Sequence, residues 1–222
     1  ETSAAQGKMA SLLKAAILPN EASLAFDDGK WVGSGDAVDL ALLAAARRAG
    51  VSHGSVNDAH PLILRIAYEP EKKYAASFHH GEDEIATFVK GAPETIIAMA
   101  ETMMYDGSVV AIDRALLLAQ KQELASQGLR VLAFAEGHIS ADQDGLLGHS
   151  HLADLTFLGF AGMKDPLRPE VPGAIAACIA AGIRVAMVTG DDPSTAAAIA
   201  RDAGLDTAGL KSVTGAALRA AE

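Results

Sequence analysis

The chain is short of positive charge and of cysteine. Its 222 residues include 18 Lys and Arg against 28 Asp and Glu, so the formal net charge is −10 at pH 7. A nucleic-acid binder needs a basic surface to neutralise phosphates, and this balance argues against that class. The one cysteine, Cys178, cannot form an internal disulfide. Its apolar neighbours Ile175 and Ile179 predict a buried thiol in a reducing compartment.

Long apolar runs are also missing. The longest uncharged apolar stretch, residues 171–183, is interrupted by Pro172 and Gly173, whereas a membrane-spanning helix needs about 20 apolar residues. The first residues do not join a basic region to an apolar one, so no targeting segment is predicted. We therefore expect the chain as given to be soluble, and the missing initiator Met hints at a piece of a longer protein.

What remains is an ordinary globular composition, with 50% hydrophobic and 21% charged residues. At roughly 150 residues per domain, the length predicts about one and a half domains. Periodicity and turn residues then predict mixed α/β structure. The expected helices are residues 4–17, 36–48, 93–99 and 115–126, and the expected strands are 62–68, 74–80, 84–90, 129–136 and 155–162. Residues 53–61 and 137–151 are predicted to be loops.

After Asp165 the pattern changes to that of a doubly wound α/β unit. A helix is expected over residues 169–181, a short apolar strand over 183–188, and a second helix from Asp192 to Gly204. We place a domain boundary near Asp165.

Thr189, Gly190 and Asp191 follow this predicted strand and precede a helix. Open α/β sheets bind ligands at the carboxyl ends of their strands, and a helix N-terminus offers free N–H groups to a phosphate. The pattern alone equally fits a plain turn followed by a helix cap.

Two lysine-containing segments are further candidates. Lys90 ends a strand beside the small residue Gly91 and a helix start, where it can meet a phosphate or a base. Lys72 and Lys73 follow the aromatic Tyr68, and such a group can hold the ring and phosphates of a nucleotide. Local evidence favours the plainer interpretation of both segments as solvated strand ends.

Histidines and glycine-rich loops give weaker signals. His79, His80, His149 and His151 have no Cys or carboxylate at a convincing ligand spacing, so we expect solvated histidines and no metal site. A Walker-type glycine loop and a GxGxxG pattern are both absent from the sequence.

Three motifs in order resemble those of P-type cation-transporting ATPases. Residues 90–94 match the KGAPE motif, residues 163–168 resemble the M-x-DPPR hinge with Leu167 at the second proline, and residues 189–191 match the TGD motif. The resemblance implies that residues 1–164 form the nucleotide-binding domain, an α+β fold with a twisted antiparallel sheet and flanking helices. It implies that residues 165–222 are part of a haloacid-dehalogenase-like phosphorylation domain.

The resemblance also implies a set of nucleotide-binding residues. The adenine-stacking aromatic falls on Tyr68, the pocket lysines fall on Lys73 and Lys90, and the arginine that clamps the polyphosphate falls on Arg130. Asp39 takes the place of the usual Glu that accepts from the adenine amino group, with a shorter stem.

Other positions follow from the remaining motifs. Gly91 keeps space open beside the nucleotide, and the hinge contributes Asp165 and Arg168. On the phosphoryl side, Thr189 would help to hold the transferring group, with Asp191 close to the nucleotide.

The implied activity is ATP hydrolysis through an aspartyl-phosphate, coupled to cation transport. ATP or ADP is the implied ligand, and Mg²⁺ belongs to the full-length protein, with ligands mostly outside this chain. The implied partners are the remaining phosphorylation, actuator and transmembrane domains, which would make this chain the cytoplasmic portion of a membrane protein. The family's DKTGT and TGDGxNDxP segments do not occur here, so we expect nucleotide binding without phosphorylation, and the ion stays open.

Two other classes of protein are alternatives. A haloacid-dehalogenase-type phosphatase needs a D-x-D-x-T/V strand end, which this sequence lacks. A non-catalytic regulatory or scaffold module would bind no nucleotide at all.

Overall fold

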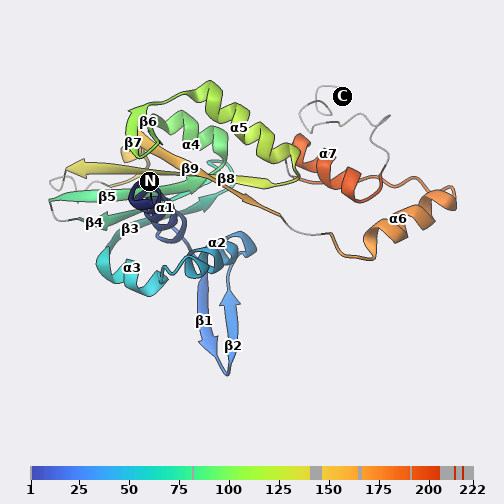
Figure 1. The fold of residues 1–222 in the computed structure, drawn as a ribbon, viewed down its shortest axis with the longest axis horizontal. Helices are drawn as coiled ribbons and strands as arrows, with labels where there is room; N and C mark the ends of the chain where they lie inside the picture. Colours follow the sequence, from blue (N-terminus) through green and yellow to red (C-terminus); the bar gives the residue numbers. More distant parts are fainter. Residues whose placement is uncertain are drawn as a thin grey trace. The chain divides into compact units, whose positions relative to one another are not determined.

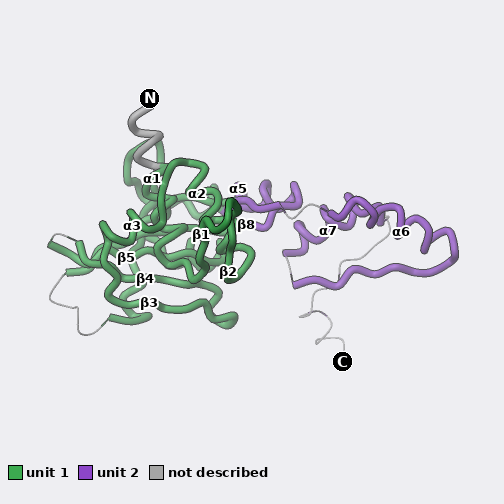
Figure 2. Tube along the Cα trace, turned by 90° about the horizontal axis from the view of Figure 1, so that it is seen from below, with its two compact units in different colours: residues 1–117, 132–161 green, residues 118–131, 162–222 purple. Residues whose placement is uncertain are grey.

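The computed structural model describes residues 2–81, 83–140, 147–164, 167–190 and 192–205, together with Val213 and Ala217; for residues 2–8 it describes the backbone alone. Two of the predicted site residues, Asp165 and Asp191, lie outside this part of the chain. The chain divides into two compact units, which we describe separately (Figure 2). Unit 1 comprises residues 1–117 and 132–161, and unit 2 comprises residues 118–131 and 162–222.

A seven-stranded sheet organises unit 1, in the order β3-β4-β5-β8-β9-β6-β7 (Figure 1). Its strands are β3 (Leu62–Glu69), β4 (Tyr74–His80), β5 (Glu84–Gly91), β6 (Ala100–Tyr105), β7 (Ser108–Ala111), β8 (Arg130–Ser140) and β9 (Leu155–Met163). The pairs β3–β4, β4–β5, β5–β8 and β6–β7 are antiparallel, and β6 pairs with β9 in parallel. The predicted mixed α/β class is confirmed.

Helices cover both faces of this sheet, because alternate strand residues point to opposite sides. On β5, Val89 packs into a core with Ile96 and Ile97 of α4 (Pro93–Met99). Its neighbour Phe88 packs into a second core on the other face. The second core receives α1 (Thr2–Ile17) and α2 (Ala37–Arg48). Lys90, two residues after Phe88, therefore points to the side of α1 and α2.

The hairpin of β1 (Ser23–Asp27) and β2 (Lys30–Ser34) forms a separate two-stranded sheet that projects beside α2 (Figure 1). Asp28 and Gly29 both have positive φ, the backbone that a tight two-residue hairpin loop requires. The Arg47 guanidinium lies 3.5 Å from the centre of the Trp31 ring. This cation–π contact links the exposed hairpin to the end of α2.

One predicted loop is wrong, because residues 53–59 form the helix α3 (His53–Ala59). Gly54, Ser55 and Asn57 have poor helix propensity, so local preference does not predict this helix. Tertiary packing compensates, since Val56 lies against the second core. The predicted loop over 137–151 also begins too early, because β8 continues to Ser140.

Unit 2 contains the later part of α5 (Arg114–Ser126), α6 (Val171–Ala180) and α7 (Pro193–Asp202). Both later helices were predicted. The predicted strand over residues 183–188 is wrong, because these described residues form no ladder and Val188 is 96% exposed. A parallel-sheet strand is stable only between neighbours that bury both of its faces. Cys178 is half-buried rather than buried, since no residue of α6 is fully covered.

No helix among the described residues is both long and apolar enough to span a bilayer.

His79 is buried, so the prediction of a solvated histidine is wrong at this position. It lies on β4 and is 1% exposed. Its Nδ1 is 2.7 Å from the His60 carbonyl oxygen, and its Nε2 is 2.8 Å from Ser77 Oγ. Burial lowers the pKa of His79 from its usual value of 6.5, and the hydrogen bond to His60 only partly opposes this.

We predict that unit 1 loses stability in mild acid because of His79. Its pKa is lower in the folded than in the unfolded chain, so below about pH 6.5 the unfolded chain binds the extra proton and the free energy of unfolding falls with pH. The maximal slope for one such group is about 1.4 kcal/mol per pH unit. Urea titrations followed by circular dichroism between pH 7 and 5 should show a shallower fall for His79→Gln.

The control is His80→Gln, which changes the exposed neighbour on the same strand. An equal pH slope in wild type and His79→Gln would contradict the prediction.

Candidate functional site

The first turn of α2 carries one side of the candidate site. Asp36 caps this helix, its Oδ1 accepting from the Val38 N–H at 2.8 Å. Gly50 closes the other end with φ of +79°, as the sequence predicted. Asp39 lies in the first turn, where the positive end of the helix dipole favours a carboxylate.

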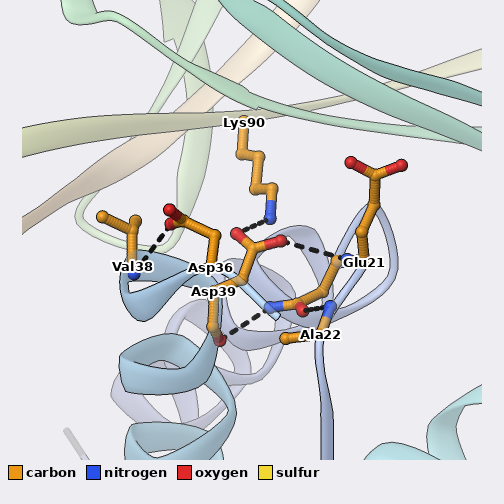
Figure 3. A network of polar contacts seen from close by, with 7 residues as sticks. Glu21, Ala22, Asp36, Val38, Asp39 and Lys90 are labelled. Carbon is orange, nitrogen blue, oxygen red and sulfur yellow. Dashed lines mark hydrogen bonds and ion pairs between the residues drawn. The ribbon is translucent and has the colours of Figure 1, made fainter. Parts of the chain in front are cut away.

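Lys90 of β5 reaches Asp39 and forms an ion pair with its Oδ1 (Figure 3). Lys90 pairs with Ala75 across the β4–β5 ladder, so its position is fixed by the sheet. The Lys90 and Asp39 side chains are only 7% and 13% exposed. Burial lowers the pKa of Lys90, while the Asp39 hydrogen bond and charge oppose that shift. The structure thus brings together two of the predicted residues, Lys90 from the sheet and Asp39 from the helix that packs on it.

Asp39 also binds the turn between α1 and β1 (Figure 3). Its Oδ2 accepts from the Glu21 N–H at 3.0 Å, and its backbone carbonyl accepts from Asn20 Nδ2 at 2.9 Å. Asn20 Oδ1 in turn accepts from the Ala22 N–H at 2.8 Å. Gly35 permits this approach, because a Cβ on it would lie 2.7 Å from the Ala22 Cβ. Both Asp39 carboxylate oxygens are therefore engaged within the protein.

Gly91 and Lys73 are also neighbours. A Cβ on Gly91 would lie 2.5 Å from the Lys73 carbonyl oxygen, closer than any side chain permits. That oxygen accepts from the Ala92 N–H at 2.9 Å. Lys73 itself has φ of +61°, a left-handed conformation that costs a non-glycine residue roughly 1 kcal/mol. Glycine at position 91 thus keeps the β3–β4 turn against the start of the KGAPE segment.

Tyr68 and Lys73 present their side chains to solvent. Tyr68 lies near the end of β3 and is 53% exposed, and Lys73 is exposed in the turn that follows. An accessible aromatic face near an accessible cation is suited to a ligand that combines a ring with phosphates.

The predicted residues of unit 2 are exposed wherever they are described. Arg130 begins β8, Arg168 precedes α6, and Thr189 and Gly190 follow the apolar segment. Unit 1 holds the others.

A carboxylate occupies the N-terminus of α7, which the TGD segment precedes. Asp192 Oδ1 accepts from the Ser194 N–H at 2.9 Å, as the predicted helix cap requires, and Oδ2 accepts from Lys121 Nζ at 2.6 Å. Burial would raise the pKa of Asp192, but these hydrogen bonds outweigh it and lower the pKa. An incoming phosphate would meet this negative charge at the helix end.

Metal ligands do not gather in the described residues, among which no three His, Cys, Asp or Glu side chains are close enough to hold an ion. Mg²⁺ prefers carboxylate and phosphate oxygens, and the Asp39 carboxylate at the predicted pocket is paired with Lys90. These residues do not fit a magnesium site.

Sequence reasoning missed the supporting residues. Asn20 and Glu21 bind Asp39 from 19 and 18 positions away, respectively, and neither belongs to a recognisable motif. The one local signal is Pro19-Asn20, a helix stop whose Asn side chain is suited to capping turns.

Comparison with known proteins identifies the family. Residues 8–170 match the family model described as P-type ATPase, cytoplasmic domain N. The chain is 38% identical over 194 residues to the cation-transporting ATPase pma1 of Synechocystis sp., an alignment of 87% of this chain and 21% of that protein. It is 35% identical over 189 residues to a calcium-transporting ATPase of Bacillus subtilis, covering 83% and 21%. It is 34% identical over 198 residues to the sodium/potassium-transporting ATPase subunit alpha-A of Artemia franciscana, covering 84% and 20%.

The chain therefore belongs to the P-type ATPase cytoplasmic N-domain family, and the predicted resemblance is confirmed. It spans about a fifth of the length of the curated relatives it matches.

We predict that Asp39→Ala destabilises unit 1 by about 3 kcal/mol, because it leaves the buried Lys90 without a partner. The double variant Asp39→Asn with Lys90→Met should recover more than half of this loss. It removes both charges, and the amide oxygen still accepts from Glu21. Urea unfolding followed by circular dichroism measures both effects.

Asp58→Ala is the matched control, since Asp58 is exposed on α3 and its loss should change stability by less than about 0.5 kcal/mol. Similar unfolding midpoints for Asp39→Ala and the control would show that the Lys90–Asp39 pair does not stabilise unit 1.

Proposed function

We propose that unit 1 binds ATP or ADP. The observation that carries this proposal is the position of the two predicted lysines at the same end of the β4–β5 ladder. Lys90 lies in the ladder beside Asp39, and the turn that carries Lys73 is held directly against Gly91. Membership of the family supports the same ligand class.

Each residue has a distinct role in this proposal. Tyr68 stacks on the adenine ring, and Lys73 attracts the phosphates as a mobile point charge. Lys90 supplies a fixed, poorly hydrated cation at the wall of the pocket. Asp39 keeps Lys90 charged and, because a carboxylate has about four acceptor positions, retains capacity to accept from the adenine amino group.

The local cluster also explains how an acidic chain attracts an anion. The net charge of −10 repels ATP at long range, but the Debye length is about 8 Å in physiological salt. Within that distance the exposed Lys73 can attract a phosphate, whereas the charge of Lys90 is already offset by Asp39. Binding should therefore be of modest affinity and should weaken as salt is added.

For the parent protein we propose ATP hydrolysis through an aspartyl-phosphate, coupled to cation transport. Residues 1–164 are the nucleotide domain and residues 165–222 are part of the phosphorylation domain. Arg130 clamps the polyphosphate, and the hinge at Asp165 and Arg168 moves the nucleotide toward the phosphorylation domain. Thr189, Gly190 and Asp191 hold the transferring phosphoryl group by positioning and charge stabilisation.

The remaining phosphorylation, actuator and transmembrane domains of the parent are the proposed partners, and this chain is its cytoplasmic portion. Mg²⁺, bound mostly by parts of the parent outside this chain, would neutralise phosphate charge there. The relatives are named for calcium and for sodium and potassium, so their names do not select one ion.

We predict saturable binding of ATP and ADP in isothermal titration, weakened about tenfold or more by Tyr68→Ala and by Lys73→Ala. Loss of base stacking costs about 1–3 kcal/mol, and loss of a charged contact costs a similar amount. Both side chains are exposed, so both variants should keep the wild-type circular dichroism spectrum.

Tyr105→Ala and Lys30→Ala are the controls, because Tyr105 is 56% exposed, close to the 53% of Tyr68, and Lys30 is an exposed cation of β2. If wild type shows no heat and no chemical-shift change at millimolar ATP, unit 1 is a scaffold rather than a nucleotide domain.

We also predict that this chain incorporates no acid-stable phosphate from γ-labelled ATP. The sequence contains no DKTGT segment, which in this family provides the nucleophilic aspartate. Acid quenching followed by gel autoradiography measures incorporation, and a labelled band sensitive to hydroxylamine would refute the prediction.

A further inference from the structure

A polar cluster joins the β3–β4 turn to a distant segment of unit 1. The short helix η2 (His149–His151) precedes β9. His149 Nε2 is 2.8 Å from Lys72 Nζ, and His149 Nδ1 is 2.7 Å from the Tyr74 hydroxyl. Lys72 Nζ also pairs with the Glu69 carboxylate at 3.1 Å. One imidazole thus contacts both sides of the turn that contains Lys73.

The chemistry of these groups assigns the protons. The Lys72 ammonium has only donors, so His149 Nε2 accepts from it and the imidazole is neutral. A neutral imidazole whose Nε2 is unprotonated carries its proton on Nδ1, and this N–H therefore donates to the Tyr74 oxygen. The tautomer is fixed by its two partners.

Both ends of this link are anchored in the core. The Tyr74 ring is buried and belongs to the first core, and Leu152, directly after η2, is buried in the same core. Lys72 and Lys73 donate their amide protons to the Glu69 carbonyl at 3.1 and 2.7 Å. Gly91 and Ala92 contact the turn at the Lys73 carbonyl oxygen, and His149 contacts it at the Lys72 ammonium.

We propose that His149 is a positioning residue for the nucleotide site: through Lys72 and Tyr74 it holds the β3–β4 turn in the conformation that places Lys73 beside Gly91. The inference rests on the proposed nucleotide binding, because Lys73 is a binding residue only under that proposal. His149 itself contacts no nucleotide.

The test compares His149→Ala and Tyr74→Phe with the matched control His151→Ala, whose ring nitrogen lies near Ser150 Oγ on the same short helix. The first readout is amide hydrogen exchange at Lys72 and Lys73 in the nucleotide-free chain. We expect roughly 3- to 10-fold faster exchange in both test variants, the effect of one lost hydrogen bond, and unchanged rates in the control.

The second readout is the ATP dissociation constant at about pH 8. We expect His149→Ala to weaken binding roughly 3- to 10-fold, the effect of one lost hydrogen bond, and His151→Ala to match wild type.

The outcomes separate the two proposals. If exchange at Lys72 and Lys73 is unchanged in His149→Ala, the link does not hold the turn and the inference fails. If wild type binds ATP and His149→Ala binds it equally well, the inference fails while the proposed function stands. If exchange accelerates but wild type binds no ATP, the proposed function fails, and with it any role of His149 in binding.

Discussion

The buried pair of Lys90 and Asp39 is the interaction on which the site depends. A lysine ammonium taken out of water costs several kcal/mol unless a partner and hydrogen bonds replace its hydration. Here one carboxylate supplies that partner and also binds the Glu21 N–H. The requirement of Lys90 for a counterion thereby fixes α2 and the α1–β1 turn against β5.

The sheet extends this order to the next strand. Register pairs Ala75 with Lys90 and Tyr74 with Gly91, so the residue before Tyr74 must lie near the glycine. Only a residue without a Cβ at position 91 leaves room for the Lys73 carbonyl. The left-handed backbone of Lys73 is thus imposed by its neighbours, since such a conformation persists only where the surrounding structure fixes it.

Sequence reasoning succeeded where the signal was local. Asp36 and Gly50 were correctly predicted to mark the two ends of α2, because cap chemistry acts within one turn. It failed where tertiary contacts decide. The helix α3 consists of poor helix formers, His79 is buried by packing, and Lys72 and His149 are 77 residues apart. Motif matching did propose Asp39 and Lys90 for one pocket, but nothing local indicated that they bind each other.

The two groups of proposed site residues depend on different conditions. The residues of unit 1 are positioned by a completed sheet with helices on both faces. Thr189 instead follows residues 183–188, where Ile183 and Val188 expose most of their side chains. Apolar exposure costs about 25 cal/mol per Å², so a neighbouring strand that covered this segment would be favoured. In the proposed mechanism, the contacts that Tyr68, Lys73 and Lys90 make with the nucleotide need unit 1 alone, whereas phosphoryl transfer at Thr189 would require residues 183–188 to be paired first.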